Sequence, residues 1–166
     1  MKIAIVSDTH GRWQAVRQAL AAEEGLDYLF FLGDFDKDGQ ALAQALDLPA
    51  YIVRGNCDEF SQQAAESSVN LDGVHFLLCH GDRYQVKNTL TPLRLRGEEM
   101  GADIVCFGHT HQPLYEEGTP ILLNPGSAAK PRLPDQSPSW GLLEITDDPA
   151  LGKKVKKYEK KDLPKL

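Results

Sequence analysis

The sequence predicts an α/β protein with a parallel sheet at its N-terminal end. Short apolar runs rich in β-branched and aromatic residues alternate with segments of helical spacing, in the order strand, helix, strand, helix, strand. The apolar runs end abruptly in polar residues and glycine, as buried parallel strands do at the edge of a sheet. Parallel neighbours need crossover connections, so this order favours helices packed against the sheet.

The first third of the chain supplies three predicted strands and two predicted helices. The strands are expected over residues 3–6, 27–32 and 49–53. Residues 12–24 carry apolar side chains at helical spacing and stop at Gly25, which predicts the first helix. The second helix is expected over residues 38–46, with its own apolar stripe.

The rest of the chain has a different pattern. Residues 68–71 and 74–79 flank Asp72-Gly73, which is typical of a β-hairpin. A helix is predicted over residues 91–100, with Thr91 as its cap and Pro92 at its first position. A buried strand is expected over residues 103–107, and the last third is expected to form antiparallel strands over residues 113–117, 120–123, 139–145 and 153–158.

Length and composition limit the class of protein. The chain has 166 residues, of which 42% are hydrophobic, and we expect a single domain over residues 1–166. The longest apolar run, residues 28–32, is too short to span a membrane, and Met1-Lys2 leads directly into a strand. We therefore expect a cytoplasmic protein. Its three cysteines lack CxxC spacing and are expected to be reduced and mostly buried.

The charge is unevenly distributed along the chain. Residues 153–166 contain seven lysines against Glu159 and Asp162, which gives this segment a net charge of +5. Because the whole chain has a net charge of −6, the rest of it carries −11. An acidic body argues against a broad nucleic-acid-binding surface. The lysines of residues 153–157 could contact an anionic partner, but the pattern favours a charged edge strand that discourages aggregation.

Metal-capable side chains follow most of the predicted strands at their carboxyl ends. Ligands bind outside these ends in open sheets with crossover connections, so the side chains should converge on one edge. Residues two apart in an extended chain point the same way, so Asp8 and His10 could reach one ion together. The seven side chains are Asp8, His10, Asp34, Asn56, His80, His109 and His111.

The types of side chain indicate the metal and its chemistry. Carboxylate, imidazole and one amide oxygen, without thiolate, suit manganese, iron, cobalt, nickel or zinc rather than calcium. Seven ligands are too many for one ion, and the Asp34 carboxylate can bridge two. Such a site stays net positive and attracts phosphate, while the ions polarise the phosphoryl oxygens and activate a water for in-line attack. We expect two divalent ions, with manganese as the first candidate.

The chain carries a series of short motifs: Asp8-Thr9-His10, Gly33-Asp34, Gly55-Asn56-Cys57-Asp58, His80-Gly81, Gly108-His109-Thr110-His111 and Asn124-Pro125-Gly126-Ser127. With these motifs it resembles the calcineurin-like metallophosphoesterases, and within them the small YfcE-type phosphodiesterases of bacteria and archaea. The resemblance covers nearly the whole chain and implies a four-layer α/β/β/α sandwich. It implies that Asp8, His10, Asp34 and His111 hold the first metal ion, and that Asp34, Asn56, His80 and His109 hold the second.

The turn around Cys57 departs from the larger relatives, which have histidine at this position near the leaving group. A thiol is a poorer general acid than imidazole at neutral pH. We therefore hypothesise a preference for aryl or activated phosphodiesters, unless Cys57 is only a small packed residue. Asp58 either orients a neighbour or caps the helix that follows it. The expected catalytic residues are Asp34, Asn56, Cys57, Asp58 and His80.

Three functions remain open from the sequence. The leading one is a dinuclear metal phosphodiesterase that uses a metal-bridging hydroxide on a small phosphodiester or nucleotide-like substrate. The others are a phosphomonoesterase or nucleotidase on the same site, and a protein-binding scaffold of the same fold. Arg132 either binds a substrate phosphate or lies solvated in its loop, and His75 is expected to face solvent. Exposed edge strands would suit a homodimer.

Overall fold

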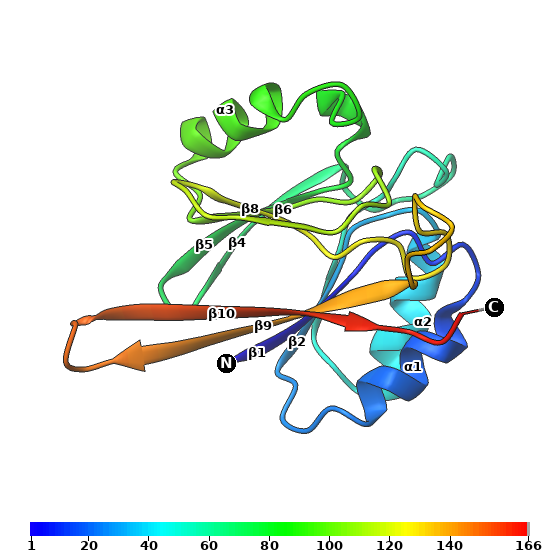
Figure 1. Ribbon diagram of the computed structural model, residues 1–166, viewed down its shortest axis with the longest axis horizontal. Coiled ribbons are helices and arrows are strands. Elements are labelled where there is room, and N and C mark those ends of the chain that lie inside the picture. The colour runs from blue at the N-terminus through cyan, green and yellow to red at the C-terminus, as the bar shows by residue number, and fades with distance from the viewer. Residues whose placement is uncertain (166) are drawn as a thin grey trace.

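Two β-sheets pack face to face between helices in the computed structural model, which describes residues 1–165 (Figure 1). The first sheet joins the two ends of the chain in the order β10-β9-β1-β2-β3. Its strands are β1 (Lys2–Val6), β2 (Tyr28–Phe31), β3 (Ala50–Ile52), β9 (Ser139–Asp148) and β10 (Lys153–Asp162). β1, β2 and β3 are parallel, as predicted, whereas β9 runs antiparallel to β1 and carries β10 at the edge.

The second sheet has the order β4-β5-β6-β8-β7. Its strands are β4 (Glu66–Leu71), β5 (Val74–Cys79), β6 (Ile104–Cys106), β7 (Leu114–Glu116) and β8 (Ile121–Asn124). The predicted β4–β5 hairpin is confirmed, and both turn residues, Asp72 and Gly73, have positive φ as such a turn requires. The prediction that residues 120–123 pair only with antiparallel neighbours is wrong. The chain returns along β7 before β8, so β8 runs parallel to β6.

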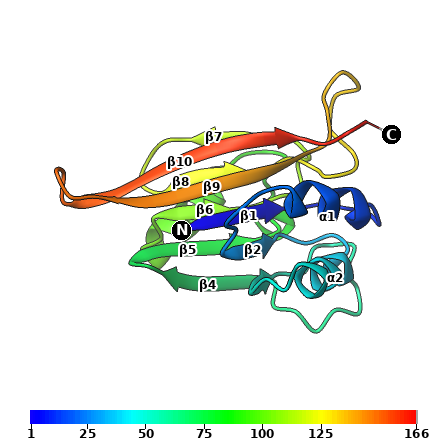
Figure 2. The same cartoon turned by 90° about the horizontal axis from the view of Figure 1, so that it is seen from below.

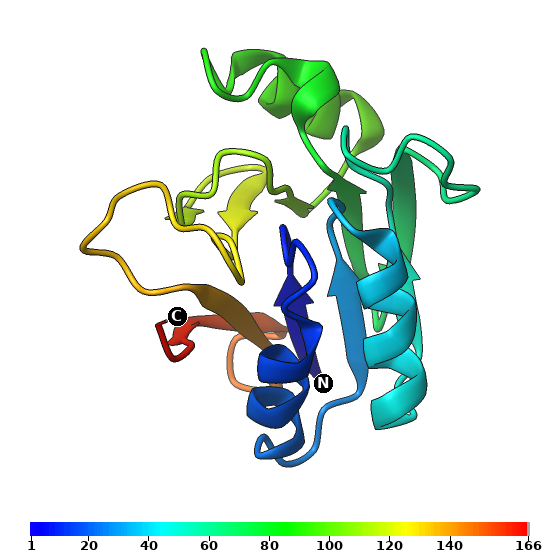
Figure 3. The same ribbon diagram turned by 90° about the vertical axis from the view of Figure 1, so that its right-hand side faces the viewer.

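Helices cover the outer faces of both sheets. α1 (Trp13–Ala21) and α2 (Asp36–Leu46) lie on the first sheet, and α3 (Thr91–Met100) lies on the second (Figures 1 and 3). A short 3₁₀ helix, η1 (Asp82–Tyr84), follows β5. The four-layer α/β/β/α sandwich is therefore confirmed. α2 begins two residues before its predicted start, and Leu90 rather than Thr91 stands at the cap position of α3.

The core consists of three apolar layers, which match the three spaces between the four layers of the fold. The central layer lies between the sheets and contains Phe30 and Phe76, whose rings meet edge to face with centroids 5.0 Å apart. A second layer packs α1 and α2 on the first sheet and includes the buried Trp140, and the third lies under α3. Cys79 and Cys106 are buried as predicted, whereas Cys57 is exposed.

The lysine-rich C-terminal strand forms an edge, as its charge pattern predicted. β10 pairs only with β9 in the first sheet, and the β9–β10 hairpin extends past the other strands (Figure 2). Its lysines occur in adjacent pairs along the strand. Tyr158, which follows the second pair, stacks on Tyr115 of the second sheet. Within residues 1–165, no helix combines the length and the apolar character that a membrane crossing requires.

Candidate metal centre

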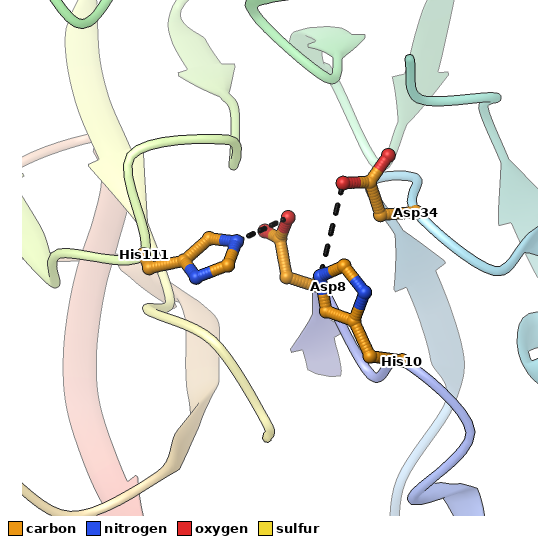
Figure 4. A group of neighbouring side chains, drawn as sticks. All are labelled: Asp8, His10, Asp34 and His111. Carbon is orange, nitrogen blue, oxygen red and sulfur yellow. Dashed lines mark hydrogen bonds and ion pairs between the residues drawn. The ribbon is translucent and has the colours of Figure 1, made fainter. Parts of the chain in front are cut away.

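Four side chains from three strand ends meet at one edge of the sandwich. Asp8 and His10 follow β1, Asp34 follows β2, and His111 follows β6 (Figure 4). Each offers one ligand atom, and these atoms all lie within 4.8 Å of one another. The structure thus places together the four residues that the resemblance assigned to the first ion.

The backbone that carries these side chains is not extended. Asp8 and His10 have positive φ angles of 54° and 43°. The expectation that they converge through the two-residue repeat of an extended chain is therefore wrong. Asp34, His109 and His111 also have left-handed backbone, at 58°, 68° and 58°. Non-glycine residues rarely adopt this conformation, and clusters of them are typical of functional sites.

Backbone carbonyls orient two of the histidines. His111 Nδ1 donates to the Lys130 carbonyl oxygen over 2.6 Å, which leaves Nε2 3.1 Å from Asp8 Oδ1. His80 Nδ1 donates to the Leu32 carbonyl oxygen over 2.7 Å, and its Nε2 lies 3.4 Å from Asp34 Oδ1. Because a carbonyl oxygen only accepts hydrogen bonds, Nδ1 carries a proton in both rings. Nε2, which faces the carboxylates, can then lose its proton and bind a metal ion, as in metal-ligating histidines.

His80 and His109 form a second group beside the first. His109 Nδ1 lies 3.2 Å from His80 Nε2, and the His109 backbone amide donates to Asp8 Oδ2 over 3.2 Å. Asn56, the remaining predicted ligand, is exposed, and its side-chain amide donates to Cys57 Sγ over 3.7 Å. Six of the seven predicted ligands are therefore linked in one cluster, whereas the side-chain hydrogen bond of Asn56 goes to Cys57.

Charges in the cluster shift the pKa values of its imidazoles in opposite directions. Burial acts to lower the pKa of His80, but Asp34 and Asp8 raise it to about 9. Hydrogen bonding to Asp8 raises the pKa of His111, whereas burial and the nearby His80 lower the pKa of His109. Burial opposes the effect of His80 on Asp34, yet the pKa of Asp34 still falls well below its usual range. The carboxylates thus gather positive charge around them, and a cation that binds here would replace protons.

The residues present fit a divalent metal ion. His10 Nε2 is buried without a hydrogen-bond partner among residues 1–165, at 3.8 Å from Asp34 Oδ2. A buried, unpartnered nitrogen is unfavourable unless something binds it, and a metal ion would do so. Two carboxylates with several imidazoles form a donor set that suits manganese, iron, cobalt, nickel or zinc.

Asp58 holds the backbone around Asp34. Its Oδ2 accepts hydrogen bonds from the amides of Asp34 and Gly55 over 3.0 and 2.8 Å, and its Oδ1 accepts from Phe35 and Asp36 over 2.8 and 3.1 Å. The alternative that Asp58 caps a following helix is wrong, because turns and bends lead from it to β4. Asp58 is a positioning residue for the loop that bears Asp34.

Several contacts around Asp8 support the site. Ser7 Oγ donates to Asp8 Oδ2 over 2.5 Å, and Ser127 Oγ donates to the Asp8 carbonyl oxygen over 2.8 Å. A Cβ at Gly108 would lie 2.7 Å from Asp8 Oδ2, so only glycine allows this close approach. The motif at residues 124–127 thus lies beside the site, as the resemblance implied, through Ser127.

Among the described residues, the side chains of Arg132 and His75 form no hydrogen bond with the cluster. The Arg132 backbone amide donates to the His111 carbonyl oxygen over 3.2 Å, while the Arg132 side chain is exposed. Its role toward a substrate phosphate stays a prediction. His75 does not simply face solvent, because it is half-buried and its ring contacts Ser68 Oγ and the Gly101 carbonyl oxygen.

Comparisons with known proteins agree with the fold and identify the family. A model of the calcineurin-like phosphoesterase superfamily domain matches residues 1–148. The probable metallophosphoesterase YsnB of Bacillus subtilis (strain 168) is 31% identical over 153 residues, which cover 90% of this chain and 88% of YsnB. The phosphodiesterase YfcE of Escherichia coli (strain K12) is 30% identical over 169 residues, with 87% and 88% covered.

A solved structure shares the whole fold at lower identity. Vps29 from Entamoeba histolytica, in a complex with Zn²⁺, has a TM-score of 0.73 at 21% identity, with 98% of this chain and 99% of that chain covered. The sandwich and its cluster of carboxylates and imidazoles are those of a metallophosphoesterase. On the family match and these relatives, the chain belongs to the calcineurin-like phosphoesterase superfamily.

Proposed function

We propose that this chain is a phosphodiesterase that works with two divalent metal ions, manganese being the first candidate. The observation that carries the proposal is the position of Asp34 between two groups of ligands. Its Oδ2 lies 3.8 Å from His10 Nε2 and its Oδ1 lies 3.4 Å from His80 Nε2. Asp34 therefore presents a separate oxygen to each histidine group, as a residue shared between two ions would. Asp8 also lies near both groups, but through Oδ1 alone, at 3.1 Å from His111 Nε2 and 3.8 Å from His80 Nε2.

The remaining residues divide into two sets around Asp34. Asp8, His10 and His111 would complete the first ion's ligands, and Asn56, His80 and His109 would complete the second ion's. When bound, divalent ions polarise a phosphoryl group and bring the pKa of a coordinated water toward neutrality. The chain itself supplies the orientation of the ligands, through the carbonyls of Leu32 and Lys130 and the carboxylate of Asp58.

Cys57 favours substrates with a good leaving group. Partial burial and the Asp34 carboxylate raise the pKa of the Cys57 thiol to about 11. Such a thiol keeps its proton at neutral pH and is a weak general acid, so departure of the leaving group gains little help from it. This supports activity toward aryl or otherwise activated diesters, and the similarity to a protein named as a phosphodiesterase agrees with it.

The test is a substrate panel on protein of known metal content. Metal-free protein is prepared with a chelator, reloaded with Mn²⁺, and assayed with bis(p-nitrophenyl) phosphate, p-nitrophenyl phosphate and nucleotides. We expect Mn²⁺-dependent hydrolysis with a preference for the diester. A preference for monoesters would assign a phosphomonoesterase or nucleotidase instead.

The alternative of another class is a protein-binding scaffold, which the likeness to Vps29 in fold favours. A chain that binds two metal ions and hydrolyses no member of the panel would support the scaffold and refute the enzyme. The scaffold would also retain its partner binding after loss of the metal, because the binding surface need not include the metal site.

A further inference from the structure

A cavity of about 610 Å³ lies beside the metal centre, between the start of α2 and the loop after β3. Its volume falls in the range of small-molecule sites, roughly 300–1,000 Å³. The lining includes two phenylalanines and three glutamines, together with the thiol of the turn described above. These residues are Phe35, Gln40, Cys57, Phe60, Gln62 and Gln63.

Two lining residues connect the cavity to the metal centre. The Phe35 ring lies against His10, with ring centroids 5.3 Å apart. The Cys57 backbone amide donates to Asp34 Oδ1 over 3.0 Å. A substituent of a phosphoryl group at the metal centre therefore has the cavity directly beside it.

The two phenylalanines are exposed in a way that stability does not explain. Phe60 is 93% exposed and Phe35 is 42% exposed, so neither contributes fully to the core. Phe35 also has left-handed backbone, with φ of 75°, which bulky residues seldom adopt. Its amide is held by Asp58 Oδ1 over 2.8 Å. Exposed apolar side chains and retained backbone strain at one place are typical of a binding site.

The charges around the cavity select among ligands. The lining contains three acidic residues, Asp36, Asp58 and Glu59, and one basic residue, Lys37. This net negative charge disfavours a second phosphate or a nucleic-acid backbone. The glutamine amides both donate and accept hydrogen bonds, which an alkyl chain could not use. A neutral heteroaromatic ring matches both features, because its faces can stack on phenylalanine and its edge can pair with amides.

We propose that this cavity binds a nucleobase-like aromatic ring of the substrate, with Phe35 and Phe60 as stacking surfaces. The proposal rests on the phosphodiesterase function for the position of the phosphoryl group. It makes the substrate a phosphoester of a nucleoside or a similar heteroaromatic compound, and it makes Phe35 and Phe60 specificity-determining residues.

The test compares two ligands that share a phosphate and differ by the base. Binding of adenosine 5′-monophosphate and of ribose 5-phosphate to the Mn²⁺-loaded protein is measured by calorimetry. Stacking of a base on an aromatic side chain strengthens binding by roughly five- to 150-fold, so we expect the nucleotide to bind at least about tenfold more tightly. Phe60→Ala and Phe35→Ala should each remove most of this difference, and Phe60→Ala should do so without changing the affinity for ribose 5-phosphate.

Matched variants separate stacking from general effects. Phe60→Tyr keeps a ring and should retain the preference for the nucleotide, whereas Phe60→Leu should lose it. Leu95→Ala removes an apolar side chain that is 57% exposed on α3, away from the cavity lining, and should leave both affinities unchanged. Equal affinities for the two ligands in the wild type, or a preference that survives Phe60→Ala, would overturn the proposal.

The same protein assayed with bis(p-nitrophenyl) phosphate separates this inference from the proposed function. Hydrolysis without any preference for the nucleotide would overturn the aromatic site and leave the phosphodiesterase standing. A preference for the nucleotide without hydrolysis of any ester would overturn the phosphodiesterase function and leave the aromatic site standing.

Discussion

Asp58 Oδ2 accepts a hydrogen bond from the backbone amide of Asp34 over 3.0 Å. The two residues are 24 positions apart, yet this contact and those from the Phe35 and Asp36 amides fix the segment between β2 and the start of α2. The Gly55 amide ties the same carboxylate to its own turn. A carboxylate that touches no predicted imidazole thus determines where Asp34 and Phe35 lie. The left-handed backbone at both residues persists because these hydrogen bonds offset its strain.

Asp58→Ala should weaken metal binding although Asp58 is not a predicted ligand. Loss of four amide partners frees the Asp34 loop, and changes to residues that orient ligands typically lower metal affinity or activity by roughly 10–100-fold. Titration of metal-free protein with Mn²⁺ measures the affinity. Glu59→Ala, at the exposed neighbouring position, is the control and should bind normally. Wild-type affinity in Asp58→Ala would contradict the positioning role.

Asp34→Ala should damage the site more than His10→Ala or Asp8→Ala. Asp34 presents one oxygen to His10 and the other to His80, so its removal would affect both proposed ions. Asp8 faces His111 and His80 through the single oxygen Oδ1, and His10 faces Asp34 alone among the ion pairs of the described residues. Metal analysis should give two ions per wild-type chain and fewer in Asp34→Ala than in His10→Ala. Activity should fall by more than the roughly 10–100-fold of an orienting residue. Equal metal content and activity in Asp34→Ala would refute the shared carboxylate.

Cys57→His should speed hydrolysis of diesters that have poor leaving groups. Imidazole can donate a proton near neutral pH, whereas the pKa of the Cys57 thiol is raised to about 11. General acid catalysis contributes roughly 10²–10⁴-fold where it operates, so a gain of about tenfold or more is expected with phenyl esters. Little change is expected with p-nitrophenyl esters. Cys57→Ser controls for loss of the thiol. Unchanged turnover of the phenyl esters by Cys57→His would contradict the prediction.

Glu66 should contribute stability that disappears in acid. Partial burial acts to raise its pKa, but hydrogen bonds from Arg96 and Tyr84 lower the pKa of Glu66 below its usual value. A lowered pKa in the folded state means that stabilisation is full above the unfolded value of about 4.3 and is lost as the pH falls through the folded value. The metal-free wild type should therefore exceed Glu66→Gln in unfolding free energy at pH 6.

The unfolding free energies of the wild type and Glu66→Gln should become equal as the pH approaches 3. Urea unfolding at several pH values measures both. Glu99→Gln is a matched control, because Glu99 also contacts Arg96 but its side chain is 70% exposed. The difference in unfolding free energy between the wild type and Glu99→Gln should change little with pH, since exposed ion pairs contribute little to stability. A difference between wild type and Glu66→Gln that stays constant from pH 6 to pH 3 would contradict the role of this cluster.

Much of the fold followed from local patterns. The parallel direction of β1, β2 and β3, the hairpin at Asp72-Gly73 and the charged edge strand were predicted, because each follows from patterns of nearby residues. The cap of α3 was wrong, since the Thr91 hydroxyl accepts from Thr89 Oγ1 and Leu90 occupies the cap position. The direction of β8 was also wrong, because the turn signal at residues 118–119 defines β7 and β8 as a pair but not their place beside β6.

The sequence by itself determined which residues could form the site. Metal-capable side chains placed after the strands of a crossover sheet must gather at one edge, since the strands end there. It did not determine how each ring or carboxylate is oriented. The contacts that orient them come from backbone groups, such as the Leu32 and Lys130 carbonyls, and from Asp58, which is distant in the chain from Asp34.

The tertiary structure alone decided the cavity beside the metal centre. Phe35 and Phe60 belong to different loops, and no periodic pattern in the sequence relates them. Their common position depends on the left-handed turn after β2, which long-range hydrogen bonds to Asp58 hold in place. Chemistry carried by residue type could therefore be predicted from the sequence, whereas specificity depends on contacts between segments that only folding brings together.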